Sequence, residues 1–378
     1  MRKVDLATHG AKRSPPDIAA LRLANQLLTR PTIESAPEVV KSLGAVQAQD
    51  YAGAKWGIAQ RTTGVLDSEI ERAIGSGEIL RTHVLRPTWH FVSATDIRWM
   101  LALTAPRIRK SAAHHDRKLG IDDDVRRRTR AVLGKALRDG KRLTRLELAG
   151  ALTNAGVRAD GTQRLAHLMI HAELDGLVCS GGRRGKQFTY ALLDECVPVT
   201  RELHREEALY TLATRYFATR GPASEDDFAW WSGLTKSDAK TAVSSIGSLE
   251  SMTIDGRKYW FTPSRPPKSA STVRLLASYD EYLVSYADRS AAQARVKPEA
   301  VGETFDFLGS YVVVSNGQII GRWKRSVTAR DVIVTLQPLT RFSRDEHNAV
   351  RREAERFAQY VELPLQIQTL PKAASRRL

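Results

Sequence analysis

The sequence predicts an α+β protein with three tandem winged-helix units, followed by a β-barrel-like C-terminal region with a terminal helix. At three places apolar residues at helical spacing give way to alternating residues around a turn. Helix, turn, helix and hairpin in this order describe a winged helix. The expected segments are a disordered start (1–16), a first unit (17–92), a helical linker (93–123), a second unit (124–192), a third unit (202–263) and the C-terminal region (269–378).

The first unit is predicted from a helix and a hairpin. Pro37 suits the first turn of a helix over residues 37–43, and Gly44 suits its C-terminal cap. Residues 78–92 are rich in β-formers on either side of an Arg-Pro turn, which indicates two paired strands.

The second and third units repeat this order. Apolar residues at helical spacing over 161–174 precede two strands around a glycine-rich, basic tip at 181–186. In the third unit, Ser224 is expected to cap a helix, and Asp255-Gly256 to turn a hairpin.

The C-terminal region has a different composition. Its segments are rich in β-branched and aromatic residues, and Asn316-Gly317 is a strong hairpin turn. Ser343 is expected to cap a final helix. These features predict a small β-barrel or sheet packed against that helix.

The charge of the chain favours a polyanionic partner. Lys and Arg number 58 against 42 Asp and Glu, a formal net charge of +16; solubility alone is the alternative explanation. The sequence has two cysteines without CxxC spacing, so it indicates neither a disulfide framework nor a cysteine-rich zinc site. No apolar run approaches the length of a membrane span, and we expect a cytoplasmic monomer.

Two carboxamides stand out at Gln47-Ala48-Gln49, directly after the first predicted helix. In an extended segment, residues i and i+2 face the same side, so both amides are expected to point into one cleft while Ala48 packs behind them. The alternative is that they only satisfy backbone groups in a loop.

Several stretches together resemble the AlkZ and YcaQ type of bacterial winged-helix DNA glycosylases: QAQDYAGAKWGIAQR, LRPTWHFV, RGPASEDDFAWWSGL, YDEYLVSYADR and GRWKR. In that family a glutamine, an apolar residue and a second glutamine form the catalytic signature, with aspartate in place of the second glutamine in one branch. The resemblance implies Gln47 and Gln49 as catalytic residues. Asp50 follows the motif and does not occupy its second catalytic position.

The chemistry of such a pair predicts a substrate class. A purine alkylated at N7 or N3 is already cationic and leaves as a neutral base, so the enzyme must chiefly position water and stabilise charge on the sugar. A glutamine supplies an acceptor oxygen and donor amide without titrating. The sequence therefore predicts a monofunctional glycosylase on duplex DNA, with no metal or cofactor; a noncatalytic winged-helix regulator is the alternative. The natural lesion, whether simple methyl group, bulky adduct or crosslink, stays open.

Several other side chains have either a functional or a purely structural interpretation. His114-His115-Asp116 is not expected to bind a metal, because adjacent helical residues point about 100° apart. Asp280 and Glu281 are expected to pair with arginines such as Arg289 rather than form an acidic patch. The Trp230-Trp231 pair is expected in the core. The residues expected to contact DNA are Arg86, Arg183, Arg184, Lys186, Arg322, Lys324 and Arg325, the last three with a solvated strand as the alternative.

Overall fold

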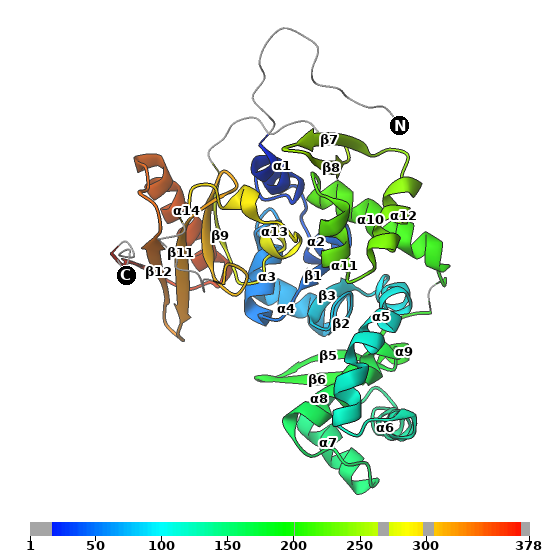
Figure 1. Ribbon diagram of the computed structural model, residues 1–378. Coiled ribbons are helices and arrows are strands. Elements are labelled where there is room, and N and C mark those ends of the chain that lie inside the picture. The colour runs from blue at the N-terminus through cyan, green and yellow to red at the C-terminus, as the bar shows by residue number, and fades with distance from the viewer. Residues whose placement is uncertain (1–16, 200, 264–271, 298–305, 372–378) are drawn as a thin grey trace. The chain divides into compact units, whose positions relative to one another are not determined.

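The structure is a computed structural model that describes residues 17–199, 201–263, 272–297 and 306–371 (Figure 1). The chain divides into two compact units, which we call unit 1 and unit 2. Unit 1 comprises Met1–Ile70, Leu212–Trp231 and Lys236–Leu378, and unit 2 comprises Glu71–Thr211 and Ser232–Thr235. Within the described ranges, no helix has the length and apolarity needed to cross a membrane. The start expected to be disordered, residues 1–16, lies outside the described residues.

Groups of helices and groups of strands follow one another along the described chain. The helices are α1 (Ile18–Asn25), α2 (Ala36–Leu43), α3 (Tyr51–Ala59), α4 (Asp67–Gly75), α5 (Ile97–Lys118), α6 (Asp123–Ala136), α7 (Arg145–Asn154), α8 (Thr162–Leu174), α9 (Leu193–Cys196), α10 (Arg205–Arg220), α11 (Glu225–Ser232), α12 (Lys236–Ser245), α13 (Glu281–Val284) and α14 (Arg344–Tyr360), with a 3₁₀ turn at Ser290–Ala292. The strands are β1 (Ala45–Gln47), β2 (Ile79–His83), β3 (Trp89–Ser93), β4 (Leu143–Thr144), β5 (Val178–Arg184), β6 (Gln187–Leu192), β7 (Glu250–Ile254), β8 (Arg257–Phe261), β9 (Val273–Leu276), β10 (Val312–Ser315), β11 (Gln318–Val327), β12 (Val332–Pro338) and β13 (Leu365–Thr369).

The hairpins expected from the sequence are all present. β2 pairs with β3, β5 with β6, β7 with β8 and β10 with β11, each antiparallel. The turn at Asn316-Gly317 has positive φ at both residues, 49° and 84°, which is the backbone that asparagine and glycine tolerate. Two of the expected helix caps are also confirmed: the Ser343 hydroxyl accepts from the Glu346 N–H at 3.1 Å, and the Ser224 hydroxyl from the Asp227 N–H at the same distance.

The C-terminal region is an open sheet, so the expectation of a barrel-like region was wrong. Its strand order is β13-β12-β11-β10-β9, and in the described residues β9 and β13 form its two edges. The β-rich sequence after residue 272 keeps a strand only as far as Leu276. Asp280 then caps α13, its side chain accepting from the Tyr282 N–H at 2.8 Å. The segment that could have lengthened the edge strand therefore turns into a helix.

Unit 1 has an aromatic core beneath this sheet. The side chains of Trp56, Trp323 and Phe357 are at most 1% exposed, and Phe357 meets both indoles edge-on at 5.0 and 5.3 Å. Each buried indole N–H donates to a carbonyl of β9, from Trp56 to Leu275 at 2.7 Å and from Trp323 to Leu276 at 2.8 Å. The core therefore fixes β9, and with it the loop leading into α13.

Unit 2 surrounds the β5–β6 hairpin with helices. Its core is mostly aliphatic, and β4 adds a third strand to the hairpin in the order β4-β6-β5. One buried polar pair links α8 to β2: Glu173 accepts from the His83 N–H at 2.9 Å, and the His83 ring lies 2.6 Å from the same carboxylate oxygen. Cys179 and Cys196, which also belong to this unit, are free thiols.

Replacing Trp323 with alanine should lower the free energy of unfolding by about 3–5 kcal/mol, because it opens a cavity beside Trp56 and Phe357. Trp230, which is 41% exposed, supplies the matched control, and Trp230→Ala should cost much less. Denaturant unfolding followed by circular dichroism measures both. Equal losses in the two variants would contradict the assignment of Trp323 to the core.

Candidate functional site

The glutamine motif lies where β1 ends. α2 stops at Leu43, and Gly44 follows with φ of 78°, so the predicted helix and its glycine cap are confirmed. Gln47 is the last residue of β1. The motif therefore lies outside any helix, with Gln47 at the end of β1 and Ala48 and Gln49 in the short segment before α3.

The two carboxamides lie in different surroundings. Gln47 is 5% exposed and Ala48 is fully buried, whereas Gln49 is exposed. The rule that residues i and i+2 face the same side applies only while the strand continues, and β1 ends at Gln47. The motif thus presents one amide within the protein and one toward solvent.

Asp50 anchors the end of the motif. Its carboxylate caps α3 by accepting from the Gly53 N–H at 3.0 Å, and it also accepts from the Ser278 hydroxyl at 3.1 Å. The Tyr311 hydroxyl donates to the same carboxylate. Burial raises the pKa of Tyr311 to about 12, against the opposing effect of Arg325, so this hydroxyl keeps its proton at neutral pH. Asp50 is therefore a structural anchor directly beside Gln49.

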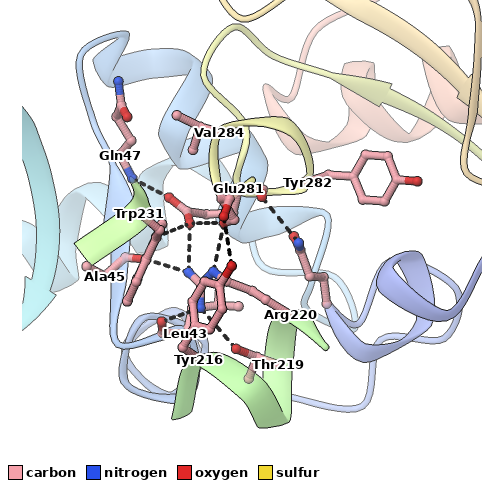
Figure 2. Close-up of polar contacts among 12 residues, drawn as sticks. Leu43, Ala45, Gln47, Tyr216, Thr219, Arg220, Trp231, Glu281, Tyr282 and Val284 are labelled. Carbon is pink, nitrogen blue, oxygen red and sulfur yellow. Dashed lines mark hydrogen bonds and ion pairs between the residues drawn. The ribbon is translucent and has the colours of Figure 1, made fainter. Parts of the chain in front are cut away.

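A buried ion pair lies on the other side of the motif (Figure 2). Arg220, the last residue of α10, and Glu281, the first of α13, are 2.7 Å apart, and both side chains are 0% exposed. Glu281 also accepts from the Gln47 N–H at 2.8 Å. In Figure 2 the Gln47 side chain extends away from the pair, and the bond drawn to Glu281 comes from the Gln47 backbone N–H.

The neighbouring carboxylate makes a second buried pair. Asp280 accepts from both terminal nitrogens of Arg61, at 3.0 and 2.8 Å. Pairing of Asp280 and Glu281 with arginines is thus confirmed, but the partners are Arg61 and Arg220. Arg289 instead donates to the Leu283 carbonyl at 3.1 Å. Nothing local in the sequence marks the true partners; the only signal is that two acids interrupt an apolar run, which predicts burial.

The basic residues of β11 do not share one face. Lys324 is exposed and Arg322 is half-buried, while the intervening Trp323 is 1% exposed, as the alternation of a strand predicts. Arg325 lies on the Trp323 side. Its guanidinium donates to the Tyr311 hydroxyl at 3.0 Å and comes within 3.7 Å of Asp50. Arg325 therefore belongs to the polar contacts that anchor Asp50.

The other expected DNA contacts lie in unit 2. Arg183, Arg184 and Lys186 are all exposed around the tip of the β5–β6 hairpin, and Arg86 is half-buried in the loop between β2 and β3. Arg184 is engaged with Glu147 at 2.5 Å. A backbone hydrogen bond from Thr144, helped by Arg184, lowers the pKa of Glu147 to about 2.

Two histidines and one aspartate of unit 2 lie close together and form a candidate metal site. His167 Nδ1 and His171 Nε2, one turn apart on α8, lie 2.9 Å from the Oδ1 and Oδ2 atoms of Asp116, respectively. Each carboxylate oxygen thus has its own imidazole partner, and burial lowers the pKa of His171. The ligand atoms of the three residues lie within 4.8 Å of one another, so in the described part of the chain this group could hold a metal ion, and His171 Nδ1 is buried without a hydrogen-bond partner. The sequence analysis did not find this cluster, because His114 and His115 adjoin Asp116 in the sequence whereas its actual partners lie on α8, far along the chain.

The aromatic pair on α11 divides between core and surface. Trp231 is fully buried and its indole N–H donates to Glu281 at 3.0 Å, whereas Trp230 is 41% exposed. The expectation of core burial is correct for Trp231 and wrong for Trp230. Residues i and i+1 of a helix point about 100° apart, so only one of them faces the interior.

Comparison with known proteins places the chain in a family. The family described as DNA glycosylase AlkZ-like matches residues 40–360. A Streptomyces sahachiroi protein described as an interstrand DNA cross-link repair glycosylase is 26% identical over 366 residues, covering 92% of this chain and 96% of the relative. The solved structure of Streptomyces sahachiroi DNA glycosylase AlkZ has a TM-score of 0.74 at 24% identity, covering 93% of this chain and 98% of that one, and shows the same mixed α and β fold. The resemblance drawn from the sequence is confirmed: the chain belongs to the AlkZ-like DNA glycosylases, enzymes that act on the N-glycosidic bonds of DNA.

Proposed function

We propose that the chain is a monofunctional glycosylase that excises cationic N7- or N3-alkylated purines from duplex DNA, acting as a cytoplasmic monomer. The observation that carries the proposal is the placement of Gln47 and Gln49 around the end of β1, between two sets of polar anchors. Glu281 bonds the backbone before Ala48, and Asp50 is bonded by Ser278 and Tyr311 after it. Anchored backbone on both sides favours a preorganised pair of amides.

The proposed chemistry needs no titrating group on the motif. A cationic base leaves as a neutral molecule, so the developing charge is on the sugar, which resembles an oxocarbenium ion. An amide oxygen accepts a hydrogen bond from the attacking water, and the amide nitrogen donates to a fixed acceptor, which sets the orientation of the oxygen. We assign this role to Gln47 and Gln49 together, with Gln49 on the exposed side where a flipped nucleotide would arrive.

We further propose that three winged-helix units, at residues 17–92, 124–192 and 202–263, present the site to DNA. Each of these segments contains helices followed by an antiparallel hairpin. Within unit 2, Arg86, Arg183, Arg184 and Lys186 would contact phosphates, and within unit 1, Arg322 and Lys324 would do so. Arg325 is the weakest of the expected contacts, because it is engaged beside Asp50.

We propose a chemical class of DNA lesion as the substrate, rather than one particular lesion. The Streptomyces relative is described as an interstrand DNA cross-link repair glycosylase, and a bulky group bonded to N7 or N3 makes a purine cationic just as a methyl group does. We therefore extend the proposed substrates from methylated purines to bulky adducts and crosslinks attached at the same atoms. The exposed position of Gln49 is compatible with large groups.

Replacing Gln47 and Gln49 together with alanine should reduce base release from 7-methylguanine DNA by at least about 10²-fold, because water and sugar lose their positioning groups. DNA affinity should stay nearly unchanged. Gln359→Ala, an exposed glutamine on α14, is the matched control. Single-turnover release and fluorescence anisotropy measure the two quantities. A double variant with full activity would refute the assignment.

The wild-type enzyme should release 7-methylguanine and 3-methyladenine but not uracil or hypoxanthine, whose departure requires activation of the leaving group. Because amides do not titrate, the rate should be flat from about pH 6 to 8. Base release from four defined duplexes across this range measures both properties. Efficient uracil excision, or a bell-shaped profile, would point instead to a general acid.

DNA binding should depend strongly on salt. If six to ten phosphates are neutralised, affinity should fall by roughly 10³–10⁵ between about 50 and 200 mM salt. Arg183→Gln should remove about one phosphate contact and so reduce the slope of log affinity against log salt concentration by about one. Arg351→Gln, whose parent side chain pairs with Glu355 at 3.2 Å, should leave it unchanged. Salt-insensitive binding would contradict a phosphate-contacting surface.

A further inference from the structure

Arg220 and Glu281 contact one edge of the strand that ends at Gln47 (Figure 2). Arg220 donates to the Leu43 carbonyl at 2.8 Å and to the Ala45 carbonyl at 3.1 Å. Glu281 accepts from the Gln47 N–H at 2.8 Å. Leu43 is the last residue of α2, whereas Ala45 and Gln47 lie on β1, where the backbone groups of residues i and i+2 point to the same edge of the strand. The ion pair therefore occupies the place that a neighbouring strand would take.

Hydrogen bonds to the remaining polar atoms make this pair rigid. The Ser285 hydroxyl accepts from Arg220 Nε and donates to Glu281, both at 2.8 Å. The Trp231 indole donates to the same Glu281 oxygen at 3.0 Å, and Arg220 also donates to the Thr219 hydroxyl at 3.0 Å. With these bonds every N–H of the guanidinium has an acceptor. Both ions are therefore satisfied without water, which is what a fully buried pair requires.

A purely structural explanation accounts for burial but not for the choice of groups. Replacing buried ion pairs with apolar residues often leaves a protein equally stable. An apolar pair, however, could not bond the carbonyls of Leu43 and Ala45 or the N–H of Gln47. These backbone groups lead directly into the glutamine motif, so the charges are placed where they fix the direction in which the Gln47 side chain leaves the strand.

Resting on the function proposed above, we infer that Glu281 and Arg220 are positioning residues for Gln47: they set the backbone from which the catalytic amide projects, without touching the DNA. Glu281 acts on the N–H of Gln47 itself, and Arg220 fixes the two preceding carbonyls. A misplacement of about 1 Å can cost roughly 10²-fold in rate. Shortening Glu281 by one methylene should therefore slow catalysis although its charge remains.

The test compares Glu281→Asp with Glu353→Asp. Glu353 forms a matched buried pair in unit 1, 2.6 Å from Arg274, with its side chain 9% exposed, and its hydrogen bond goes to β9 rather than to β1. Three quantities are measured: single-turnover release of 7-methylguanine, affinity for the same duplex, and hydrogen exchange of a peptide covering residues 45–48. The exchange readout does not depend on activity.

Glu281→Asp should lower the rate by about 10- to 100-fold, leave DNA affinity within about threefold, and speed exchange at the Gln47 amide. Glu353→Asp should change none of these. Equal loss of rate in both variants, or full activity in Glu281→Asp with a freed Gln47 amide, would overturn the inference.

Two further outcomes separate this inference from the proposed function. If Glu281→Asp does not fold, Ser285→Ala removes only the hydroxyl between the two ions, and it should slow base release several-fold in the same direction. A wild-type protein that releases no base would defeat the proposed function. The hydrogen exchange result would then still decide whether Glu281 fixes the strand.

Discussion

The buried pair of Arg220 and Glu281 is the interaction on which the geometry of the glutamine motif depends. It joins the end of α10, the start of α13 and the edge of β1, three segments far apart in the sequence. Breaking such a pair by removing one partner leaves an uncompensated charge in the interior, which is strongly destabilising. The three segments must therefore come together as a unit, and the position of Gln47 is set by the fold of unit 1 rather than by its own loop.

This arrangement separates the groups that carry charge from the groups proposed to do chemistry. The carboxylates near the motif are engaged: Glu281 with Arg220, Asp280 with Arg61, and Asp50 with Ser278 and Tyr311. The two amides at the centre are neutral at every accessible pH. A site of this kind suits a leaving group that needs no proton, because stabilisation of the sugar and placement of water are then the main tasks.

Local signals in the sequence were enough to predict the elements around the site. Gly44 ends α2, Ser224 and Ser343 cap their helices, and Asn316-Gly317 turns a hairpin, because each depends on the chemistry of a few adjacent residues. The motif itself was found by its unusual pairing of amides and by family resemblance. Its position after α2 followed from the helix cap alone.

Long-range choices could not be predicted in the same way. Whether Glu281 pairs with Arg220 or Arg289 depends on which helix end lies beside β1, and no local spacing encodes that. The barrel-like expectation failed because Asp280 starts a helix where the composition favoured a longer strand. Gln47 is buried and Gln49 is exposed, a difference that strand alternation does not predict, because β1 ends at Gln47. Each error arose where tertiary contacts override a local pattern.

The central claim is that the two amides stabilise a cation-like sugar and its attacking water. The most direct test is binding to duplexes carrying either a cationic pyrrolidine analogue of the oxocarbenium ion or a neutral tetrahydrofuran abasic site. The wild-type protein should prefer the cationic analogue by at least about 10²-fold. The Gln47→Ala, Gln49→Ala double variant should lose that preference while still binding the neutral site. An undiminished preference in the double variant would contradict the claim.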